Sequence, residues 1–191
     1  MPAGVGIEAG ESNAWLLPGG SSRTLGGAVL KVESSKMKQG VRAAVIAIQG
    51  DSVLLVRHVH PASGEEWWVP PGGALEDTDA SVQACAAREV REETGLEVIV
   101  GRLIYMREFR DADRNTRWVE LYFLADRLNG TLTAEHLKDK RQGEDYIREA
   151  KWLGKEELRG RPVFPEILKD QFWADLGRDF PRVRYLGLSI G

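Results

Sequence analysis

A sharp turn followed by one well-marked helix constrains this chain more than any other feature. The sequence Pro-Pro-Gly-Gly at residues 70–73 is a strong turn signal, and an acidic loop follows it. Residues 80–93 then predict a helix, because they are rich in Ala and contain neither Pro nor Gly. We expect Gly95 to end this helix in the left-handed conformation, and Asp79 or Thr78 to cap its start.

Three glutamates, Glu89, Glu92 and Glu93, lie near the end of this predicted helix. At about 100° per residue they fall within one narrow arc of the helix surface. Like charges at these spacings repel, and a helix C-terminus disfavours negative charge, so the arrangement destabilises an isolated helix. Converging carboxylates suit Mg²⁺ or Mn²⁺, and a bound cation would reverse both penalties. The alternative is a solvated acidic face that Arg88 and Arg91 partly neutralise.

Together these segments resemble the signature of a known family. The residues from Gly73 to Leu96 resemble the Nudix box, whose usual pattern is G-x5-E-x7-R-E-U-x-E-E-x-G-U, with U aliphatic. Every position from Arg88 onward matches that pattern. Asp79 stands where the family has Glu, and eight residues instead of seven separate it from Arg88, so we expect a capping or loop role for Asp79. The order of predicted elements follows the family from residue 38 to residue 176.

The resemblance implies an α/β protein with the Nudix-type α/β/α sandwich around a mixed β-sheet. It implies a hydrolase that uses Mg²⁺, or alternatively Mn²⁺, to cleave a diphosphate linkage in a nucleoside diphosphate linked to another moiety. The metal ligands that it implies are Glu89, Glu92, Glu93 and the backbone carbonyl of Gly72 or Gly73. Arg88 would orient Glu89 or its neighbour through a charge-assisted hydrogen bond.

The general base varies in position within the family. Glu92 or Glu93 is the first candidate here, and the alternatives outside the box are Glu120, Glu144 and Glu149. For substrate binding, we expect Trp68 or Tyr105 to stack on a base, because both aromatic residues flank the loop. Arginines that could hold phosphates are Arg57, Arg107 and Arg110, although exposed arginines at strand ends are common.

The substrate is less well defined than the reaction. A nucleoside triphosphate or similar small nucleotide is the leading interpretation. No Pro occurs between Glu97 and Arg161, which argues against the ADP-ribose-specific subclass of the family. A non-catalytic nucleotide-sensing module on the same fold is the alternative, and the intact glutamate cluster argues against it.

The domain organisation is predicted from a change in composition. Residues 1–37 are rich in Gly and Ser and are predicted to be an arm, either loosely packed or added as an edge strand. Residues 38–191 are predicted to be the Nudix hydrolase domain. Within them we expect a hairpin turning at residues 49–51, further strands at 67–69, 97–108, 117–125 and 146–153, and a closing helix at 165–176.

Composition excludes several classes of protein. A net charge of −3 argues against a nucleic-acid binder with a broad basic surface. Cys85 is the only cysteine, so no intrachain disulfide can form, and a reducing cytoplasm is the expected compartment. No run approaches the ~18 apolar residues of a membrane span, so no membrane partner is expected. The expected partner is a small nucleotide-like molecule, with a homodimer as an additional alternative.

Two competing motifs are weaker. Residues 187–191 fit G-x-S-x-G, but the nucleophile elbow needs a helix after the serine and triad partners further along, and we interpret the match as coincidence. His58 and His60 could ligate zinc, but no third ligand at a suitable spacing is visible. We therefore expect both histidines to be polar rim residues.

Overall fold

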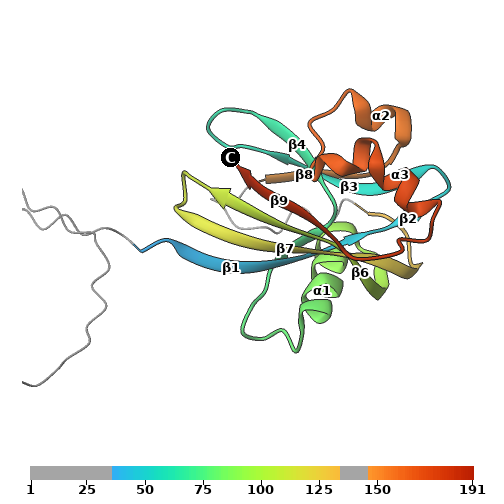
Figure 1. Cartoon of the computed structure of the whole chain (residues 1–191), viewed down its shortest axis with the longest axis horizontal. Helices are drawn as coiled ribbons and strands as arrows, with labels where there is room; N and C mark the ends of the chain where they lie inside the picture. Colours follow the sequence, from blue (N-terminus) through green and yellow to red (C-terminus); the bar gives the residue numbers. More distant parts are fainter. Residues whose placement is uncertain (1–35, 134–145) are drawn as a thin grey trace, which may run out of the picture. The chain divides into compact units, whose positions relative to one another are not determined.

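The strands form two sheets that lie beside one another (Figure 1). The computed structural model describes residues 36–133 and 146–191. The larger sheet runs in the order β5-β1-β7-β6-β9 and is mixed, because β1–β7 and β6–β9 are parallel while the other pairs are antiparallel. Its strands are β1 (Lys38–Ile46), β5 (Gly72–Ala74), β6 (Glu97–Asp111), β7 (Thr116–Asn129) and β9 (Arg184–Ile190).

The second sheet is antiparallel and is centred on β3. Its strands are β2 (Ile48–Gln49), β3 (Ser52–Val59), β4 (Glu66–Val69) and β8 (Tyr146–Gly154). The predicted hairpin is confirmed, with Gly50 at a φ of 58° in its turn. It is shorter than expected, because only β2 pairs with the start of β3, whereas residues 43–46 belong to β1 in the larger sheet.

Helices cover both faces of the larger sheet. α1 (Val82–Thr94) packs on one face, and α2 (Lys155–Arg159), the 3-10 helix η2 (Glu166–Lys169) and α3 (Gln171–Leu176) supply the other side (Figure 1). The predicted α/β fold around a mixed sheet is therefore confirmed. The predicted single helix over 165–176 is wrong, because Asp170, with φ −137° and ψ −77°, separates η2 from α3.

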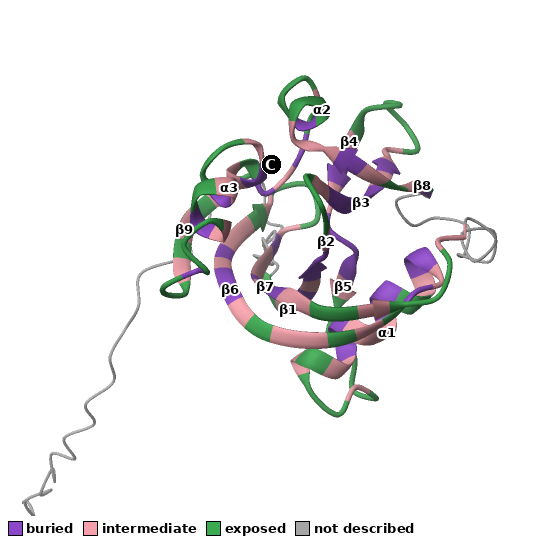
Figure 2. Ribbon diagram, turned by 90° about the vertical axis from the view of Figure 1, so that its right-hand side faces the viewer, coloured by how far each residue is buried: buried purple, intermediate pink, exposed green. Residues whose placement is uncertain are grey.

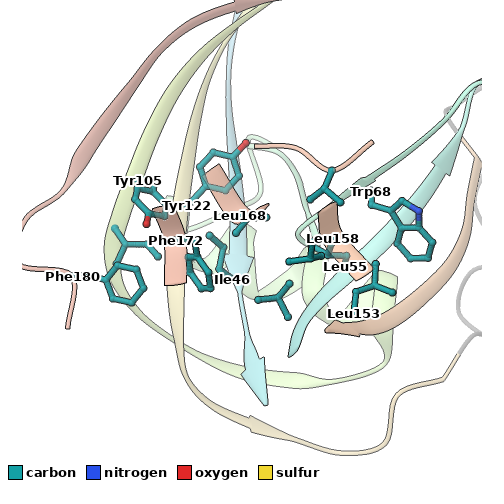
Figure 3. Close-up of a cluster of buried hydrophobic side chains, with 13 residues drawn as sticks. Ile46, Leu55, Trp68, Tyr105, Tyr122, Leu153, Leu158, Leu168, Phe172 and Phe180 are labelled. Carbon is teal, nitrogen blue, oxygen red and sulfur yellow. The ribbon is translucent and has the colours of Figure 1, made fainter. Parts of the chain in front are cut away.

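Two apolar clusters fill the space on either side of the sheet. The first joins the buried face of α1 to β1 and β7 through Ala86, Val90, Val45 and Phe123. The second packs η2, α3 and the opposite face of the strands together, and Figure 3 shows its large side chains, among them Phe172. β3 contributes to both clusters by alternating its side chains, and it is almost entirely buried (Figure 2).

None of the helices in the described part of the chain combines the length and apolar character needed to cross a membrane. The predicted arm, residues 1–37, lies outside the described residues except for its last two positions. Glu144, one of the alternative general bases, also lies outside them.

A chain that begins at Met37 should fold and should keep most of its activity. β1 begins at Lys38, and the buried residues of the described core begin at Ala43. Removing the first 36 residues therefore takes away no described core contact. Thermal unfolding followed by circular dichroism, together with turnover, would check this. Insoluble protein, or a melting temperature lowered by many degrees, would show that residues 1–36 complete the core.

Candidate functional site

The site is built on α1, and its sequence explains where that helix starts and stops. The Ser81 hydroxyl accepts a 3.1 Å hydrogen bond from the backbone N–H of Ala84, so Ser81 is the N-cap. The prediction that Asp79 or Thr78 caps the helix is therefore wrong. Gly95 ends the helix at φ 72°, as predicted, because the left-handed conformation is open to glycine.

Two of the three glutamates on α1 are buried where the helix packs against β5, the edge strand of the larger sheet. Glu93 is 2% exposed, and its Oε2 accepts a 2.9 Å hydrogen bond from the backbone N–H of Gly72. Glu89, one turn earlier, is also buried, whereas the Glu92 side chain is 42% exposed. A buried carboxylate is costly unless charged or polar groups compensate it, so α1 keeps two acids here at the expense of stability.

The Gly-Gly pair is required by close packing on both sides. A Cβ at Gly73 would lie against the Glu89 carboxylate, closer than real Cβ atoms approach. A Cβ at Gly72 would collide with the backbone of β1 at Ala43 and Ala44. The two glycines therefore let a bare backbone lie between β1 and the carboxylates of α1.

Arg88 connects the acids to one another. Its Nε and Nη2 donate to the two carboxylate oxygens of Asp79 at 3.0 and 2.9 Å, a bidentate pair. Its Nη1 donates to Glu89 Oε1 at 2.8 Å and lies 3.5 Å from Glu92 Oε2. The bonds from Arg88 to Asp79, with one from the backbone N–H of Glu76, hold the pKa of Asp79 well below its ordinary value. Asp79, one residue further from Arg88 than in the usual pattern, still reaches it.

Replacing Asp79 with Asn should lower activity by about tenfold or more, because the group that orients Arg88 loses its charge. It should also change stability in a pH-dependent way. The folded-state pKa of Asp79 lies below its ordinary value of 3.8, so its contribution to stability is fully present above pH 3.8 and is lost progressively as the pH falls from 3.8 toward the folded-state value. The difference in melting temperature between wild type and Asp79→Asn should therefore be constant near neutrality and shrink below about pH 3.8. A difference that persists unchanged at pH 3 would contradict this role.

Cys85 lies beneath this network and ties α1 to β5. Its thiol is 3.4 Å from the carbonyl oxygen of Ala74, to which it donates. Burial, and then the nearby charge of Asp79, raise the pKa of Cys85 to about 11, so the thiol stays protonated at neutral pH. Cys85 therefore serves as a small buried donor and not as a nucleophile.

The donor set fits a hard divalent cation in its chemistry. The Glu89 and Glu93 carboxylates lie against the backbone of Gly73 and Gly72, and carboxylate oxygens are the ligands that such a cation prefers. Among residues 36–133 and 146–191, no three carboxylate, thiol or imidazole side chains already converge as a metal cluster. Instead, Arg88 donates to Glu89 and the Gly72 N–H donates to Glu93. A cation would have to bind these carboxylates through oxygen lone pairs that the two donors leave open.

The predicted substrate-binding residues do not gather at this site. Tyr105 is 1% exposed, its hydroxyl donates to Asp175 at 3.0 Å, and burial followed by that hydrogen bond raises its pKa. Trp68 is also buried, with the guanidinium of Arg57 6.0 Å from its ring centroid. Neither ring offers a face for stacking on a base in this structure. Arg57 itself is paired with Glu66 at 3.0 Å and with a second carboxylate.

The alternative general bases are differently placed. Glu120 is buried on β7, where its Oε2 accepts from Arg107 at 2.6 Å and from the Tyr122 hydroxyl at 2.8 Å. Glu149 lies on β8 and pairs with Arg57 at 3.4 Å. Both carboxylates are thus committed to ion pairs within the fold.

The serine motif and the two histidines do not form the catalytic or zinc-binding geometry that each would need. Ser189 sits within β9, opposite Phe109 on β6, and not on a strand-to-helix turn. His58 is buried and stacked on Trp67 with ring centroids 5.5 Å apart, so the prediction that it is a rim residue is wrong. His60 is half-buried and hydrogen-bonded to Ser63.

Solved structures with the same fold support this reading of the architecture. The E. coli ORF135 protein superposes with a TM-score of 0.58 at 23% identity, covering 76% of this chain and 96% of that one. A NUDIX hydrolase from Nitrosomonas europaea gives the same TM-score and identity and covers 78% of this chain and 93% of its own. At this level of identity, the likeness shows the fold alone.

Sequence comparison supports the family directly. The Bacillus subtilis (strain 168) protein YvcI, described as an uncharacterized Nudix hydrolase, is 36% identical over 98 residues. That match covers 50% of this chain and 59% of YvcI, so this chain spans less than two thirds of its relative. A family model described as NUDIX domain matches residues 38–171. Proteins of this family generally cleave pyrophosphate bonds in nucleotide-like compounds and use divalent metal ions. Since the matched residues make up well over half of the chain and carry the glutamate site, this protein belongs to the Nudix family.

Proposed function

We propose that this protein is a metal-dependent hydrolase that cleaves a diphosphate linkage in a small nucleotide, with nucleoside triphosphates as the first substrates to test. The observation that carries the proposal is the pair of buried acids, Glu89 and Glu93, packed against the Gly72–Gly73 backbone. A fold keeps two buried carboxylates four residues apart at a helix C-terminus only where something offsets their repulsion. A divalent cation would offset it, and would also attract a phosphate-bearing substrate.

We assign separate roles to the residues of the site. Glu89 and Glu93, with Glu92 and a carbonyl of Gly72 or Gly73, would hold Mg²⁺, and Mn²⁺ has the same ligand preferences. When bound, the cation would neutralise charge on the phosphate oxygens and lower the pKa of a coordinated water. Arg88 holds Glu89 in place through its 2.8 Å hydrogen bond and is itself fixed by Asp79.

Glu92 is the best candidate for the general base. Its side chain is 42% exposed, so water can reach it, and its contact with Arg88 is long at 3.5 Å. Glu93 is buried and already accepts the Gly72 N–H, which suits a ligand better than a proton acceptor. A base must lie within hydrogen-bond reach of the attacking water, and ion-paired Glu120 and Glu149 are less available for that.

A substrate panel tests this function. The purified full chain would be incubated with Mg²⁺ and nucleoside triphosphates, nucleoside diphosphate sugars and dinucleoside polyphosphates, and the products separated by ion-exchange chromatography. Hydrolysis at a diphosphate linkage is the expected result. A Glu93→Gln preparation purified in parallel excludes a contaminating hydrolase, because contamination would be equal in both. Binding of a nucleotide without any turnover across the panel would instead support a sensing module.

A further inference from the structure

Arg42 reaches the proposed site from the face of the sheet opposite α1. Its neighbours on β1, Ala43 and Val45, pack in the cluster under α1, so Arg42 projects from the other face. Its Nη2 donates to the carbonyl oxygen of Gly72 at 3.1 Å. The N–H of the same glycine donates to Glu93. Arg42 and Glu93 therefore hold one peptide segment of β5 from opposite sides.

Arg42 has no carboxylate partner among residues 36–133 and 146–191. Within the same residues, its hydrogen bond to Gly72 is its only one. Its cross-strand neighbour on β7, Glu120, is bound by Arg107 and by the Tyr122 hydroxyl. A half-buried guanidinium without a counter-charge is costly, so its position indicates an anionic partner.

The other arginines near the site are already neutralised. Arg88 is shared among three carboxylates, and Arg57 and Arg107 each have carboxylate partners as well. The sequence offers Arg57 and Arg107 as arginines that could hold phosphates, but their ion pairs leave them poorly suited to that role. Arg42 is the guanidinium that combines partial burial, proximity to Gly72 and an unpaired charge.

We propose that Arg42 binds a phosphate oxygen of the substrate at the edge of β5; the inference rests on the proposed diphosphate hydrolysis. A guanidinium has five N–H donors in a planar fork that matches phosphate oxygens, and only one of its nitrogens is engaged, at Gly72. Partial burial weakens screening by water and so strengthens the attraction to phosphate. Anchored at Gly72, Arg42 would set the phosphate beside the carboxylates of α1.

The competing interpretation is that Arg42 only fastens β5 to β1. Both interpretations predict some loss of stability on replacement, so stability alone cannot separate them. Affinity for a diphosphate separates them, since a purely structural tie has no reason to alter binding once the protein is folded. The useful probe is methylenediphosphonate, a diphosphate analogue that is not hydrolysed, measured by titration calorimetry with Mg²⁺ present.

Three variants of the full chain make the test: Arg42→Gln, Arg42→Lys and the control Arg127→Gln. Arg127 is an exposed arginine on β7, so the control makes the same change in net charge. Arg42→Gln should raise the Kd for methylenediphosphonate, and the KM for the substrate, by about tenfold or more. Arg42→Lys keeps the charge but loses the fork, so it should weaken binding by several-fold. The control should match the wild type.

An unchanged Kd in folded Arg42→Gln would overturn the inference, and so would equal weakening in the Arg127 control. If Arg42→Gln does not fold, Arg42→Lys decides, and a Lys variant that binds as tightly as the wild type overturns it. Should the wild type turn over no substrate, the proposed function fails, yet binding of the analogue and its dependence on Arg42 remain measurable. If the Arg42 variants turn over substrate normally with unaltered KM and Kd, the role of Arg42 is refuted and the proposed function stands.

Discussion

Replacing Glu93 with Gln should lower the turnover number by at least about 100-fold, the lower end of what losing one transition-state electrostatic contact costs. Gln keeps the shape of the side chain and one oxygen that can accept the 2.9 Å hydrogen bond from the Gly72 N–H. It removes only the negative charge, which is what a cation and its bound water would respond to. Steady-state kinetics at saturating Mg²⁺, on the best substrate of the panel, would measure the loss.

The same variant should remain folded. Removing one of two neighbouring negative charges near a helix C-terminus relieves repulsion, so the free energy of unfolding should change by no more than about 1 kcal/mol. The matched control is Glu97→Gln, an exposed glutamate that starts β6 just beyond the same helix. If Glu93 served only the packing of α1 against β5, both variants would turn over substrate like the wild type, and that result would sink the assignment.

The sequence predicts α1 well because the signals that define it are local. An Ala-rich run without Pro or Gly, ended by Gly95, gives the helix and its C-terminal boundary within a few residues. The periodicity also places Glu89 and Glu93 on one face, and burial of both follows once that face meets β5. The N-cap prediction fails because the predicted helix starts at residue 80, two residues early, which places the true N-cap, Ser81, inside the helix.

The consequence of the extra residue before Arg88 could not be seen from spacing. A linear pattern suggests that the displaced Asp79 loses its link to Arg88. In the fold, the helix begins only at Val82, so the irregular residues before it absorb the added length. Asp79 therefore still forms its bidentate pair with Arg88, and a motif mismatch of one residue is neutral in three dimensions.

Long-range pairing explains the remaining errors. In the sequence an aromatic residue such as Tyr105 looks available for stacking, but its burial depends on α3 closing over β6 from far along the chain. The division of the strands into two sheets is likewise set by β1 pairing with β7, some eighty residues away. The position of Arg42 cannot be predicted from the sequence for the same reason, since nothing near it in sequence reveals that Gly72 lies within hydrogen-bond distance.

Removing divalent metal should abolish turnover altogether. The buried carboxylates of Glu89 and Glu93 repel one another and also repel the phosphates of any substrate, and the charge of Arg88 is shared with Asp79. Without a cation, a diphosphate has little reason to enter such a site. Activity in excess EDTA should therefore equal the rate without enzyme, and Mg²⁺ or Mn²⁺ added in excess over the chelator should restore it.

A second measurement, independent of activity, locates the cation. Binding only to the folded state stabilises it by RT ln(1 + [L]/Kd), which is about 2.7 kcal/mol at one hundred times the Kd, so Mg²⁺ should raise the melting temperature by several degrees. Glu93→Gln should lose most of that increase and Glu97→Gln should keep it. Full turnover in excess EDTA would end the metal-dependent mechanism. Equal Mg²⁺ stabilisation of both variants would instead place the cation away from Glu93 and from the carbonyls of the Gly-Gly turn.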